Sequence, residues 1–514
     1  MIFRLRLTGK TFVSTLFAIS LLSACKKDPD KVVTPEPALS SEEVMKTFVF
    51  RSAKNPVFLK DVVGEIIGDT IYTRAFSASN LSYLVPEFTF EGAKVMVDDK
   101  EQKSSATDNN FTKPVTYRVV AEDKSEKKYV VKFSDSGIAA LYISTDGKPI
   151  TSKEIYVNGT IRLVSNFTEV VFDGKMEVKG RGNSTWYDMP KKPYKIKLDK
   201  KAPLLGMPEN KSWVLLANYA DKTLLRNEMA FILSRSIGRE FTTQSRYVEV
   251  FINGNYEGNY QLTQQVKEGK GLVDVEDGGY LIEQDLFANG EPTYFYTGKG
   301  MPFVIKYPDD DKVTKAQKDY ISAHFQKAED ALFSVTFADP VNGYRKYIDV
   351  DTYVDYYIIN EVIGNPDVFR STYMFKKNDD DKIYTGPVWD FDKAANNDNR
   401  PGDQTSGLML DAAFEPKLWV RRMMEDQTFR QRIRSRWNEL KPKIKALSAN
   451  IDPLAKKLAV SQAANFKRWD IIGRQSYIEV YVWPTYEAEV AYLKKFLDTH
   501  ITWLDTKFNS ATYQ

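Results

Sequence analysis

The sequence is almost without cysteine and histidine, with one cysteine and two histidines in 514 residues. A single cysteine excludes an internal disulfide bond. His324 lies in the predicted helical stretch Lys315–Ser334, and His500 lies in another near the end, so both are expected to be packing or surface residues. Histidine triads, cysteine–histidine pairs and multi-histidine zinc sites are therefore disfavoured. Any chemistry is expected to use carboxylates, lysines, arginines and hydroxyls.

An excess of either charge is also missing. The formal net charge is +3, and Arg4, Arg6 and Lys10 at the start of the chain supply three positive charges. Without these residues the chain is close to neutral, so it offers no electrostatic attraction for nucleic acid. We therefore expect no nucleic-acid partner. Long apolar runs are missing too, because no stretch reaches the roughly 18 apolar residues of a membrane-spanning helix.

The start of the chain is typical of a lipoprotein signal peptide. After the positive residues comes Thr11–Leu22, a short and mostly apolar run, and Leu22-Ser23-Ala24-Cys25 then places small residues before a cysteine. An ordinary secretory signal with a chance cysteine is the alternative, but lipidation explains why the single cysteine stands here. We predict a signal peptide at residues 1–24 and lipidation of Cys25. The protein is then expected outside the cytoplasm on a membrane of the cell envelope, with the outer membrane favoured.

The rest of the chain is long enough for several domains. About 490 residues remain after the leader, which is more than one hydrophobic core usually serves. Residues 25–40 are polar and contain three prolines, as expected of a flexible tether behind a lipid anchor. Residues 41–135 predict a small β-sandwich similar to immunoglobulin-like domains, with turn residues between short strands. The expected strands are Thr47–Phe50, Thr70–Thr73, Lys94–Val97, Thr116–Ala121 and Lys128–Phe133.

A second unit is expected at residues 137–510. Its first part is strand-like, and Asn253-Gly254 between two apolar runs predicts a β-hairpin. Thr223–Ile237 has helical spacing, with Asp221 as the expected N-cap and Gly238 after the end. From about Lys312 the pattern is mostly helical. The sequence therefore predicts an α+β domain with a cleft between two lobes. The expected strands are Ala139–Ser144, Glu154–Val157, Thr160–Val164, Lys175–Lys179, Tyr194–Leu198, Tyr247–Ile252 and Tyr256–Leu262.

Two aspartates flank a predicted hairpin in the helical part. Asp367 precedes the strand Ser371–Lys377, and Asp390 follows the return strand Lys382–Val388. A hairpin brings its two ends together, so the aspartates should lie side by side. Protein kinases use this local layout, with one carboxylate orienting the attacking hydroxyl and another holding a divalent ion. Solvated turn aspartates at the ends of an ordinary hairpin are the alternative.

A glycine-containing loop is a second candidate site. Gly180–Trp186 follows a predicted strand, and its backbone amides, with Arg181 and two hydroxyls, could cradle phosphate groups. Lysines follow it, and Lys195 and Lys197 share one face of the next strand, where a lysine could pair with phosphate. An ordinary turn and a solvated strand face are the alternative interpretations.

Six blocks of sequence resemble the spore-coat CotH kinase family, in the same order along the chain. The resemblance spans roughly 70% of the chain, and six ordered blocks are more specific than any single motif. It implies a lipoprotein member of the family, in which an immunoglobulin-like module precedes an atypical, reduced kinase-like domain. That domain would be β-rich in its first part and helix-rich in its second. The blocks are Leu141–Tyr156, Lys179–Leu198, Trp213–Asn227, Gly254–Val266, Gly278–Glu283 and Gly386–Asn397.

The resemblance also implies an activity. Members are regarded as secreted protein kinases that use ATP and Mg²⁺ or Mn²⁺ to phosphorylate Ser or Thr of exported or surface proteins. The family's catalytic aspartate falls on Asp367 and its metal-binding aspartate on Asp390, with Asp392 at the second acidic position of the Trp-Asp-x-Asp motif. Other family positions are Arg181, Asn183, Lys192 and Arg226, implied to bind the nucleotide, and the neighbouring Asn227.

Two departures from the family pattern leave other functions open. Members often have Asn where Ser371 stands and Glu where Gln264 stands, so an amide ligand and a charge are missing here. The first alternative is an adhesion or binding lipoprotein that keeps the CotH fold with little or no catalysis. The second is a carboxylate-based glycoside hydrolase, because paired aspartates and many aromatic residues suit sugars. The sequence identifies neither the substrate nor the oligomeric state.

Overall fold

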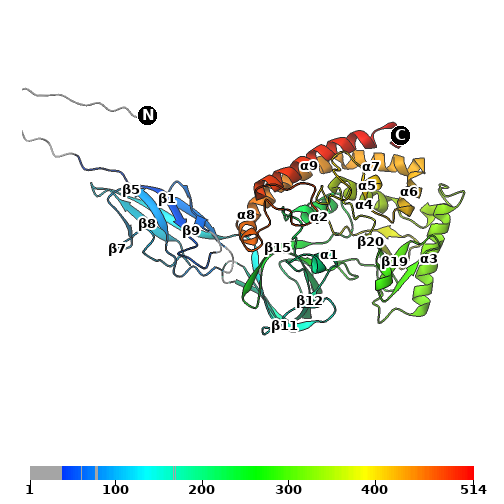
Figure 1. Cartoon of the computed structure of the whole chain (residues 1–514), viewed down its shortest axis with the longest axis horizontal. Coiled ribbons are helices and arrows are strands. Elements are labelled where there is room, and N and C mark those ends of the chain that lie inside the picture. The colour runs from blue at the N-terminus through cyan, green and yellow to red at the C-terminus, as the bar shows by residue number, and fades with distance from the viewer. Residues whose placement is uncertain (1–37, 59–60, 76–78, 166, 168) are drawn as a thin grey trace, which may run out of the picture.

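The computed structural model describes residues 38–58, 61–75, 79–165, 167 and 169–514. The predicted signal peptide, Cys25 and most of the predicted tether lie outside these residues. Figure 1 shows an elongated molecule, with a β-rich unit at the N-terminal end and long helices along the C-terminal part. The expected α+β class, with a β-rich first part and a helical second part, is confirmed. Within the described chain, no helix is long and apolar enough to cross a membrane.

Residues 44–135 form two β-sheets around one core. One sheet has the strand order β2-β1-β5, and the other has the order β3-β4-β9-β8-β6-β7. Alternating side chains such as Phe48, Phe50 and Tyr117 point between the sheets and are buried. The strands are β1 Val44–Phe50, β2 Val62–Val63, β3 Glu65–Ile67, β4 Thr70–Ala75, β5 Glu87–Glu91, β6 Lys94–Val97, β7 Lys100–Glu101, β8 Val115–Val120 and β9 Glu126–Asp135. The expected strands are all present, and β2, β3, β5 and β7 were not predicted.

The next strands form a closed barrel in the order β10-β11-β12-β13-β14-β16-β15. Its closure depends on a parallel pair, in which Ala139 of β10 lies opposite Val248 of β15. The predicted strand Glu154–Val157 is wrong, because the Ser152 hydroxyl accepts hydrogen bonds from the amides of Glu154 and Ile155 and turns the chain. The strands are β10 Ala139–Ser144, β11 Val157–Ser165, β12 Glu169–Gly180, β13 Tyr194–Ala202, β14 Asn210–Leu216, β15 Ser245–Ile252 and β16 Asn255–Gln264.

The predicted Asn-Gly hairpin is confirmed between β15 and β16. Asn253 and Gly254 have φ values of 48° and 82°. Two consecutive positive φ angles are the signature of a type I′ turn, whose twist matches that of the flanking strands.

The sandwich and the barrel are joined by very little chain. β9 ends at Asp135 and β10 begins at Ala139, so only Ser136, Gly137 and Ile138 connect them. Ser136 donates its amide to the carbonyl of Ala75 at 2.9 Å. Phe167, in the turn between β11 and β12, packs against the core of the sandwich.

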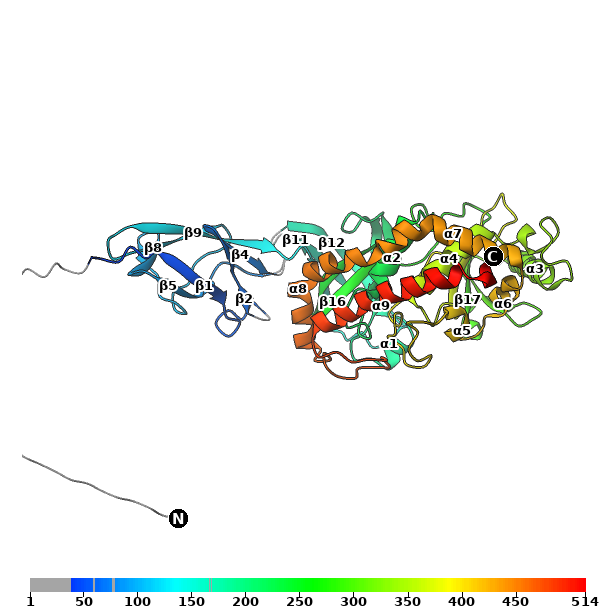
Figure 2. The same ribbon diagram turned by 90° about the horizontal axis from the view of Figure 1, so that it is seen from above.

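A second sheet and a group of helices complete the C-terminal part. The sheet has the order β18-β19-β17-β20-β21. Figure 2 shows α7 and α9 lying along the same face, next to α4. The strands are β17 Tyr280–Asp285, β18 Tyr294–Tyr296, β19 Pro302–Tyr307, β20 Ser371–Lys376 and β21 Tyr384–Thr385. The helices are α1 Ser184–Tyr187, α2 Arg226–Ser236, α3 Lys315–Phe333, α4 Val350–Ile363, α5 Met409–Ala412, α6 Leu418–Met424, α7 Gln427–Lys445, α8 Ile451–Arg468 and α9 Tyr486–Phe508.

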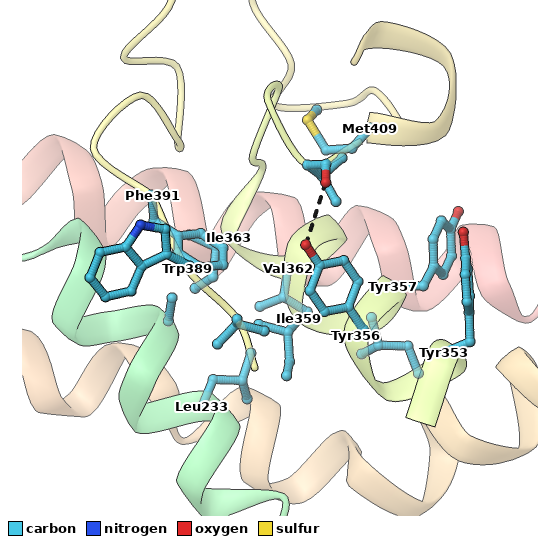
Figure 3. Packing of buried hydrophobic residues seen from close by; sticks show 14 of the residues in the cluster. Leu233, Tyr353, Tyr356, Tyr357, Ile359, Val362, Ile363, Trp389, Phe391 and Met409 are labelled. Carbon is cyan, nitrogen blue, oxygen red and sulfur yellow. Dashed lines mark hydrogen bonds between the residues drawn. The ribbon is translucent and has the colours of Figure 1, made fainter. Parts of the chain in front are cut away.

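Helix α4 is the centre of the large core (Figure 3). It is buried on nearly every side, as expected of a helix that is apolar all round. Ile359 and Val362 of α4 pack in the same cluster as Leu233 of α2 and as Trp389 and Phe391, which follow β21. The core therefore fixes the segment that carries Asp390 directly against α4.

The predicted helix Thr223–Ile237 is found as α2, with Gly238 after its end at a φ of 85°. Asp221 lies further upstream than an N-cap position. It still stabilises the start of α2, because its carboxylate accepts the amide of Arg226 at 2.8 Å. Both histidines are packing residues, as predicted. His324 is 5% exposed and His500 is fully buried, and each ring contacts a backbone carbonyl.

Candidate functional site

The hairpin brings Asp367 and Asp390 together. Gly364 ends α4 in the left-handed conformation, and Asp367 lies in the loop that follows. β20 and β21 pair only through Met374 with Thr385 and Phe375 with Tyr384, so the return strand is shorter than predicted. Asn365 links the two ends: its amide group donates to the carbonyl of Asp390 at 3.3 Å, and its oxygen accepts the amide of Asp367 at 3.1 Å.

Lys393 lies among three aspartates. Its ammonium group is 3.2 Å from Oδ2 of Asp367. Burial alone would lower the pKa of Lys393, but the carboxylates of Asp367, Asp392 and Asp390 outweigh burial and raise that pKa. Lys393 thus holds together side chains that would otherwise repel one another.

Asp390 and Asp392 carry carboxylates that have no hydrogen-bond or ion-pair partner among the described residues. Asp390 is exposed, yet the surrounding protein displaces enough water that desolvation raises its pKa, with a further rise from Asp367. Burial, followed by the Asp390 carboxylate, raises the pKa of Asp392 to about 7. Asp390 also has a φ of 66°, a left-handed conformation that is uncommon outside glycine.

This carboxylate pair fits a divalent cation only in part. In the part of the chain that the structure describes, no group of three or more Asp, Glu, His or Cys side chains is arranged to hold a metal ion. Mg²⁺ is commonly held by one or two carboxylates together with phosphate oxygens of the substrate. Two accessible or half-buried carboxylates without partners match that donor set. The pair therefore suits a cation that arrives with a phosphate ligand.

The barrel contributes positive charge near Asp390. The Arg181 guanidinium lies 5.6 Å from the ring of Trp389 and acts on the Asp390 carboxylate. Lys195 of β13 lies directly opposite Lys179 of β12. Burial, followed by Lys179, Arg181, Lys267 and Lys306, lowers the pKa of Lys195 to about 8. Lys195 has no ion-pair partner within the described ranges, although Lys306 pairs with Glu283 and Lys267 pairs with Asp309.

Ser371 and Gln264, the two departures from the family pattern, have defined partners. The hydroxyl of Ser371 donates to Glu283 at 2.5 Å, and Glu283 also pairs with Lys306 at 3.1 Å. Gln264 is 3% exposed and donates to the carbonyl of Pro208 at 2.8 Å. Both side chains therefore have hydrogen-bond partners.

Asn183 and Lys192, two of the predicted nucleotide-binding residues, brace the glycine-containing loop. Lys192 donates to the carbonyl of Trp186 at 2.6 Å, and the side-chain oxygen of Asn183 accepts from Lys153 at 2.9 Å. Gly180 is required here, because a Cβ at this position would lie 2.3 Å from the ring of Trp186. Of the residues predicted to bind nucleotide, Arg181 is the one that acts on Asp390.

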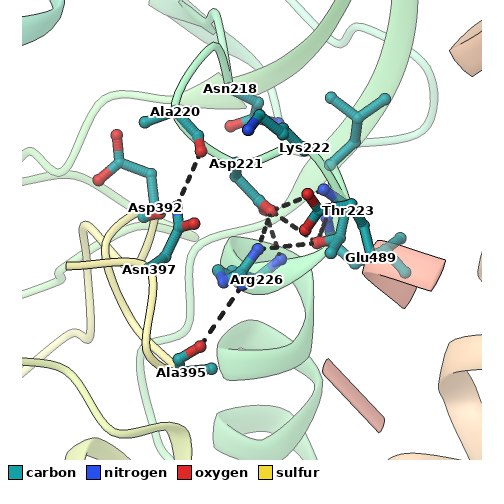
Figure 4. A network of polar contacts seen from close by, with 12 residues as sticks. Asn218, Ala220, Asp221, Lys222, Thr223, Arg226, Asp392, Ala395, Asn397 and Glu489 are labelled. Atoms are coloured by element: carbon teal, nitrogen blue, oxygen red, sulfur yellow. Dashed lines mark hydrogen bonds and ion pairs between the residues drawn. The ribbon is translucent and has the colours of Figure 1, made fainter. Parts of the chain in front are cut away.

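Arg226 occupies a different position from the one its predicted role requires (Figure 4). It is 2% exposed and donates to the carbonyl of Ala394 at 2.9 Å. Figure 4 shows its pair with Asp221, at 2.5 Å, and its hydrogen bond to the carbonyl of Ala395, at 3.4 Å. A guanidinium enclosed in this way cannot reach a nucleotide. We therefore replace its predicted nucleotide-binding role by a structural one, in which the Asp221–Arg226 pair clamps the loop after Asp390.

Other side chains hold the same loop. Asn227 accepts the amide of Phe391 at 2.8 Å, and Asn397 donates to the carbonyl of Ala220 at 2.8 Å. The side chain of Asp392 points away from the Asp221–Arg226 pair (Figure 4). The segment that leaves the barrel therefore positions the acidic loop.

The sequence analysis did not single out three basic residues that lie close to Asp367. Besides Lys393, the guanidinium groups of Arg400 and Arg370 lie 3.7 Å and 4.0 Å from Oδ1 of Asp367. Oδ1 is buried and has no hydrogen-bond partner in the described structure. The only available signal was the closeness of these residues to Asp367 and Asp390 along the chain. That signal is weak because charged residues are usually solvated.

Comparison with known families identifies the class of protein. The family model described as CotH kinase protein matches residues 178–504, and the model described as SGBP, N-terminal, matches residues 58–133. The chain belongs to the CotH kinase protein family, as the resemblance predicted. An SGBP N-terminal module precedes the family region.

Other comparisons add little. No curated protein sequence matches this chain. A crystal structure of a "putative glycoside hydrolase" from Bacteroides thetaiotaomicron is similar at 16% identity, over 52% of this chain and 63% of that one, with a TM-score of 0.13. The chain thus spans less than two thirds of that protein, and a likeness of this size carries no argument about fold or activity.

Proposed function

We propose that this protein is an atypical protein kinase, which transfers the terminal phosphoryl group of ATP to a Ser or Thr hydroxyl of an exported protein. One observation carries the proposal. The carboxylates of Asp390 and Asp392 have no hydrogen-bond or ion-pair partner in the described chain, and the Arg181 guanidinium, which acts on Asp390, lies with Lys195 in a group of cations. A phosphate group with a divalent cation satisfies both sides at once. We also propose that α4, the hairpin and Asp390 correspond to a reduced kinase-like layout.

Asp367 is the proposed catalytic base. Its unbonded Oδ1 receives the proton of the acceptor hydroxyl while the hydroxyl oxygen bonds to phosphorus. The bond from phosphorus to the bridging oxygen breaks, and ADP leaves with that electron pair. Lys393 holds Oδ2 at 3.2 Å and so orients the carboxylate.

Asp390 and Asp392 are the proposed holders of Mg²⁺ or Mn²⁺. When bound, such an ion neutralises charge on the phosphate oxygens. Arg181 and Lys195 bind the phosphate chain from the barrel side, Arg181 by its planar fork and Lys195 as a point charge. Asn183 and Lys192 keep the loop of Arg181 in place.

An adhesion or binding lipoprotein with little or no catalysis is the second candidate. The observation in its favour is the set of ion pairs around Asp367, because Lys393, Arg370 and Arg400 already surround the carboxylate that would have to accept the hydroxyl proton.

Transfer of labelled phosphate from ATP decides between these candidates. We expect the full chain, with Mg²⁺ or Mn²⁺, to label itself or a mixture of Ser- and Thr-containing peptides. Asp367→Asn and Asp390→Asn should each abolish labelling. Asp379→Asn, at the exposed tip of the same hairpin, is the matched control and should keep it. Absence of labelling with both metals would favour the adhesion function.

The cellular position is a separate proposal. We propose that lipid on Cys25 anchors the protein to an envelope membrane, where its substrates are other exported or surface proteins. Cys25→Ser should release the folded protein from the membrane fraction. Retention of that variant would contradict the anchor without affecting the kinase proposal.

A further inference from the structure

Arg370 has an unusual amount of unused hydrogen-bonding capacity. Its Nε is buried and has no hydrogen-bond partner among the residues described. Its side chain is 31% exposed and approaches Asp367 only to 4.0 Å. The guanidinium lies 4.5 Å from the centre of the Phe414 ring, which fixes its plane. A guanidinium held in this way can still offer a pair of donors to an oxyanion.

Arg400 lies beside it on the same aromatic ring. Its guanidinium is 4.4 Å from the centre of the Phe414 ring. Nε of Arg400 donates to both carboxylate oxygens of the buried Asp398, at 2.8 Å and 3.1 Å. This anchor leaves the side chain 36% exposed, and the terminal nitrogen that also pairs with Asp398 lies 3.7 Å from Oδ1 of Asp367. The two arginines and Phe414 thus form a rigid, positively charged edge next to Asp367.

This edge, defined as Arg370, Arg400 and Phe414, differs from the phosphate-binding side of the site. The strongest charges acting on Asp390 are Lys393, Asp367, Arg181 and Glu283. Arg370 and Arg400 contact Asp367 instead. Since the acceptor hydroxyl must reach Asp367, the edge lies on the acceptor's path.

We propose that the edge formed by Arg370, Arg400 and Phe414 selects acceptor segments that carry an anionic group one or two residues from the accepting hydroxyl. The spacing follows from the contacts of about 4 Å to Asp367 and a rise of about 3.3 Å per extended residue. The anion is a carboxylate of Asp or Glu or a phosphate on Ser, because both present the oxygens that guanidinium binds in a fork. This inference rests on the proposed function.

Matched peptides test the selection. Each carries one Ser, flanked by Asp, by phosphoserine or by Asn, and kcat/KM is measured with the full chain. We expect the anionic peptides to exceed the Asn peptide by at least about tenfold, the effect of one charge-assisted hydrogen bond. Arg370→Gln should reduce this ratio to below about threefold, and Arg370→Lys should restore part of it. Arg421→Gln, an exposed arginine paired with Glu415, is the control and should keep the ratio.

A binding measurement separates this inference from the kinase proposal. Peptides with Ala in place of the acceptor Ser are labelled, and their fluorescence anisotropy is recorded with the same variants. Selective binding of anionic peptides that is lost in Arg370→Gln supports the edge even without phosphoryl transfer. Equal use and equal binding of Asp, phosphoserine and Asn peptides would overturn it, whether or not the enzyme is active.

Discussion

The ammonium group of Lys393 lies 3.2 Å from the carboxylate of Asp367, although the two residues are 26 positions apart. Lys393→Gln should destabilise the protein by about 2 kcal/mol, because it removes a charged hydrogen bond and exposes three carboxylates to mutual repulsion. Urea melts measure the change. Mg²⁺ with ATP should recover part of the loss, since the cation replaces the missing charge.

The control for Lys393 is Lys377→Gln, which breaks the exposed pair with Glu240. Such surface pairs contribute about 1 kcal/mol or less. Equal stability of the wild type and Lys393→Gln would contradict the bridging role.

Asp390 and Asp367 should respond differently to ligand. Mg²⁺ or Mn²⁺ with nucleotide should stabilise the wild type by about 2.7 kcal/mol at a hundredfold excess over Kd. Asp390→Asn should abolish this gain, because it removes a ligand charge, and Asn tolerates the left-handed backbone at this position. Asp367→Asn should keep most of the gain and lose transfer. Thermal melts with and without metal and ATP test both expectations. If the melting temperature of the wild type does not shift, the proposed metal and nucleotide site is contradicted.

Lys195 should contribute to nucleotide affinity. Lys195→Met removes a cation that has no ion-pair partner in the described chain, so the free protein should be as stable as the wild type or more so. Nucleotide affinity should fall by at least about tenfold. Titration with a fluorescent ATP analogue measures this. Lys197→Met, on the same strand face but paired with Glu177, should leave affinity unchanged. Equal affinity losses in both variants would argue against a specific role.

Arg226 should matter for stability and not for ligand contact. Arg226→Gln leaves Asp221 buried without its cation, which should cost about 3–5 kcal/mol. Arg235→Gln, at a partly exposed pair on the same helix, should cost less, about 1 kcal/mol. Denaturant melts without ligand provide the comparison. A stable Arg226→Gln protein that has lost nucleotide binding would restore the role predicted from the sequence.

Lys191 should make stability depend on pH. It is 1% exposed, donates to Asn465 at 2.8 Å, and burial lowers its pKa to about 7. Between pH 7 and about 10 the unfolded chain binds more protons at this residue than the folded protein. The free energy of unfolding should therefore rise with pH, by at most about 1.4 kcal/mol per unit.

Lys191→Met should flatten this rise, whereas Lys192→Met, at the neighbouring half-buried lysine, should retain it. Urea melts at pH 7 and pH 9 measure the difference. A rise of the same size in the wild type and Lys191→Met would show that other groups cause it.

Local patterns predicted local structure well. Asn253-Gly254 predicted a hairpin because Asn and Gly both adopt the positive φ angles that the turn requires. The approach of Asp367 and Asp390 followed from the hairpin between them. The parallel pairing of β10 with β15 could not be predicted, because their residues are more than a hundred positions apart and no turn links them.

The positions of the charged residues of the site could not be predicted for a similar reason. Lys393 and Arg226 have ordinary sequence contexts, and a pattern cannot distinguish a solvated cation from one buried against carbonyls. The family resemblance implied a nucleotide-binding role for Arg226, and no pattern singled out Lys393. Tertiary packing decided both positions, through the loop that the Asp221–Arg226 pair holds.

The short connection between the sandwich and the barrel has a consequence for reach. Three residues between β9 and β10, and Phe167 packed against the sandwich core, give the two parts little freedom to swing separately. For a chain held by lipid at Cys25, the tether would set how far the protein stands from the membrane, while the sandwich would set the direction in which Asp367 and Asp390 face. Substrate proteins at that height and angle would be accessible to Asp367 and Asp390, and others with equally suitable sequences would not.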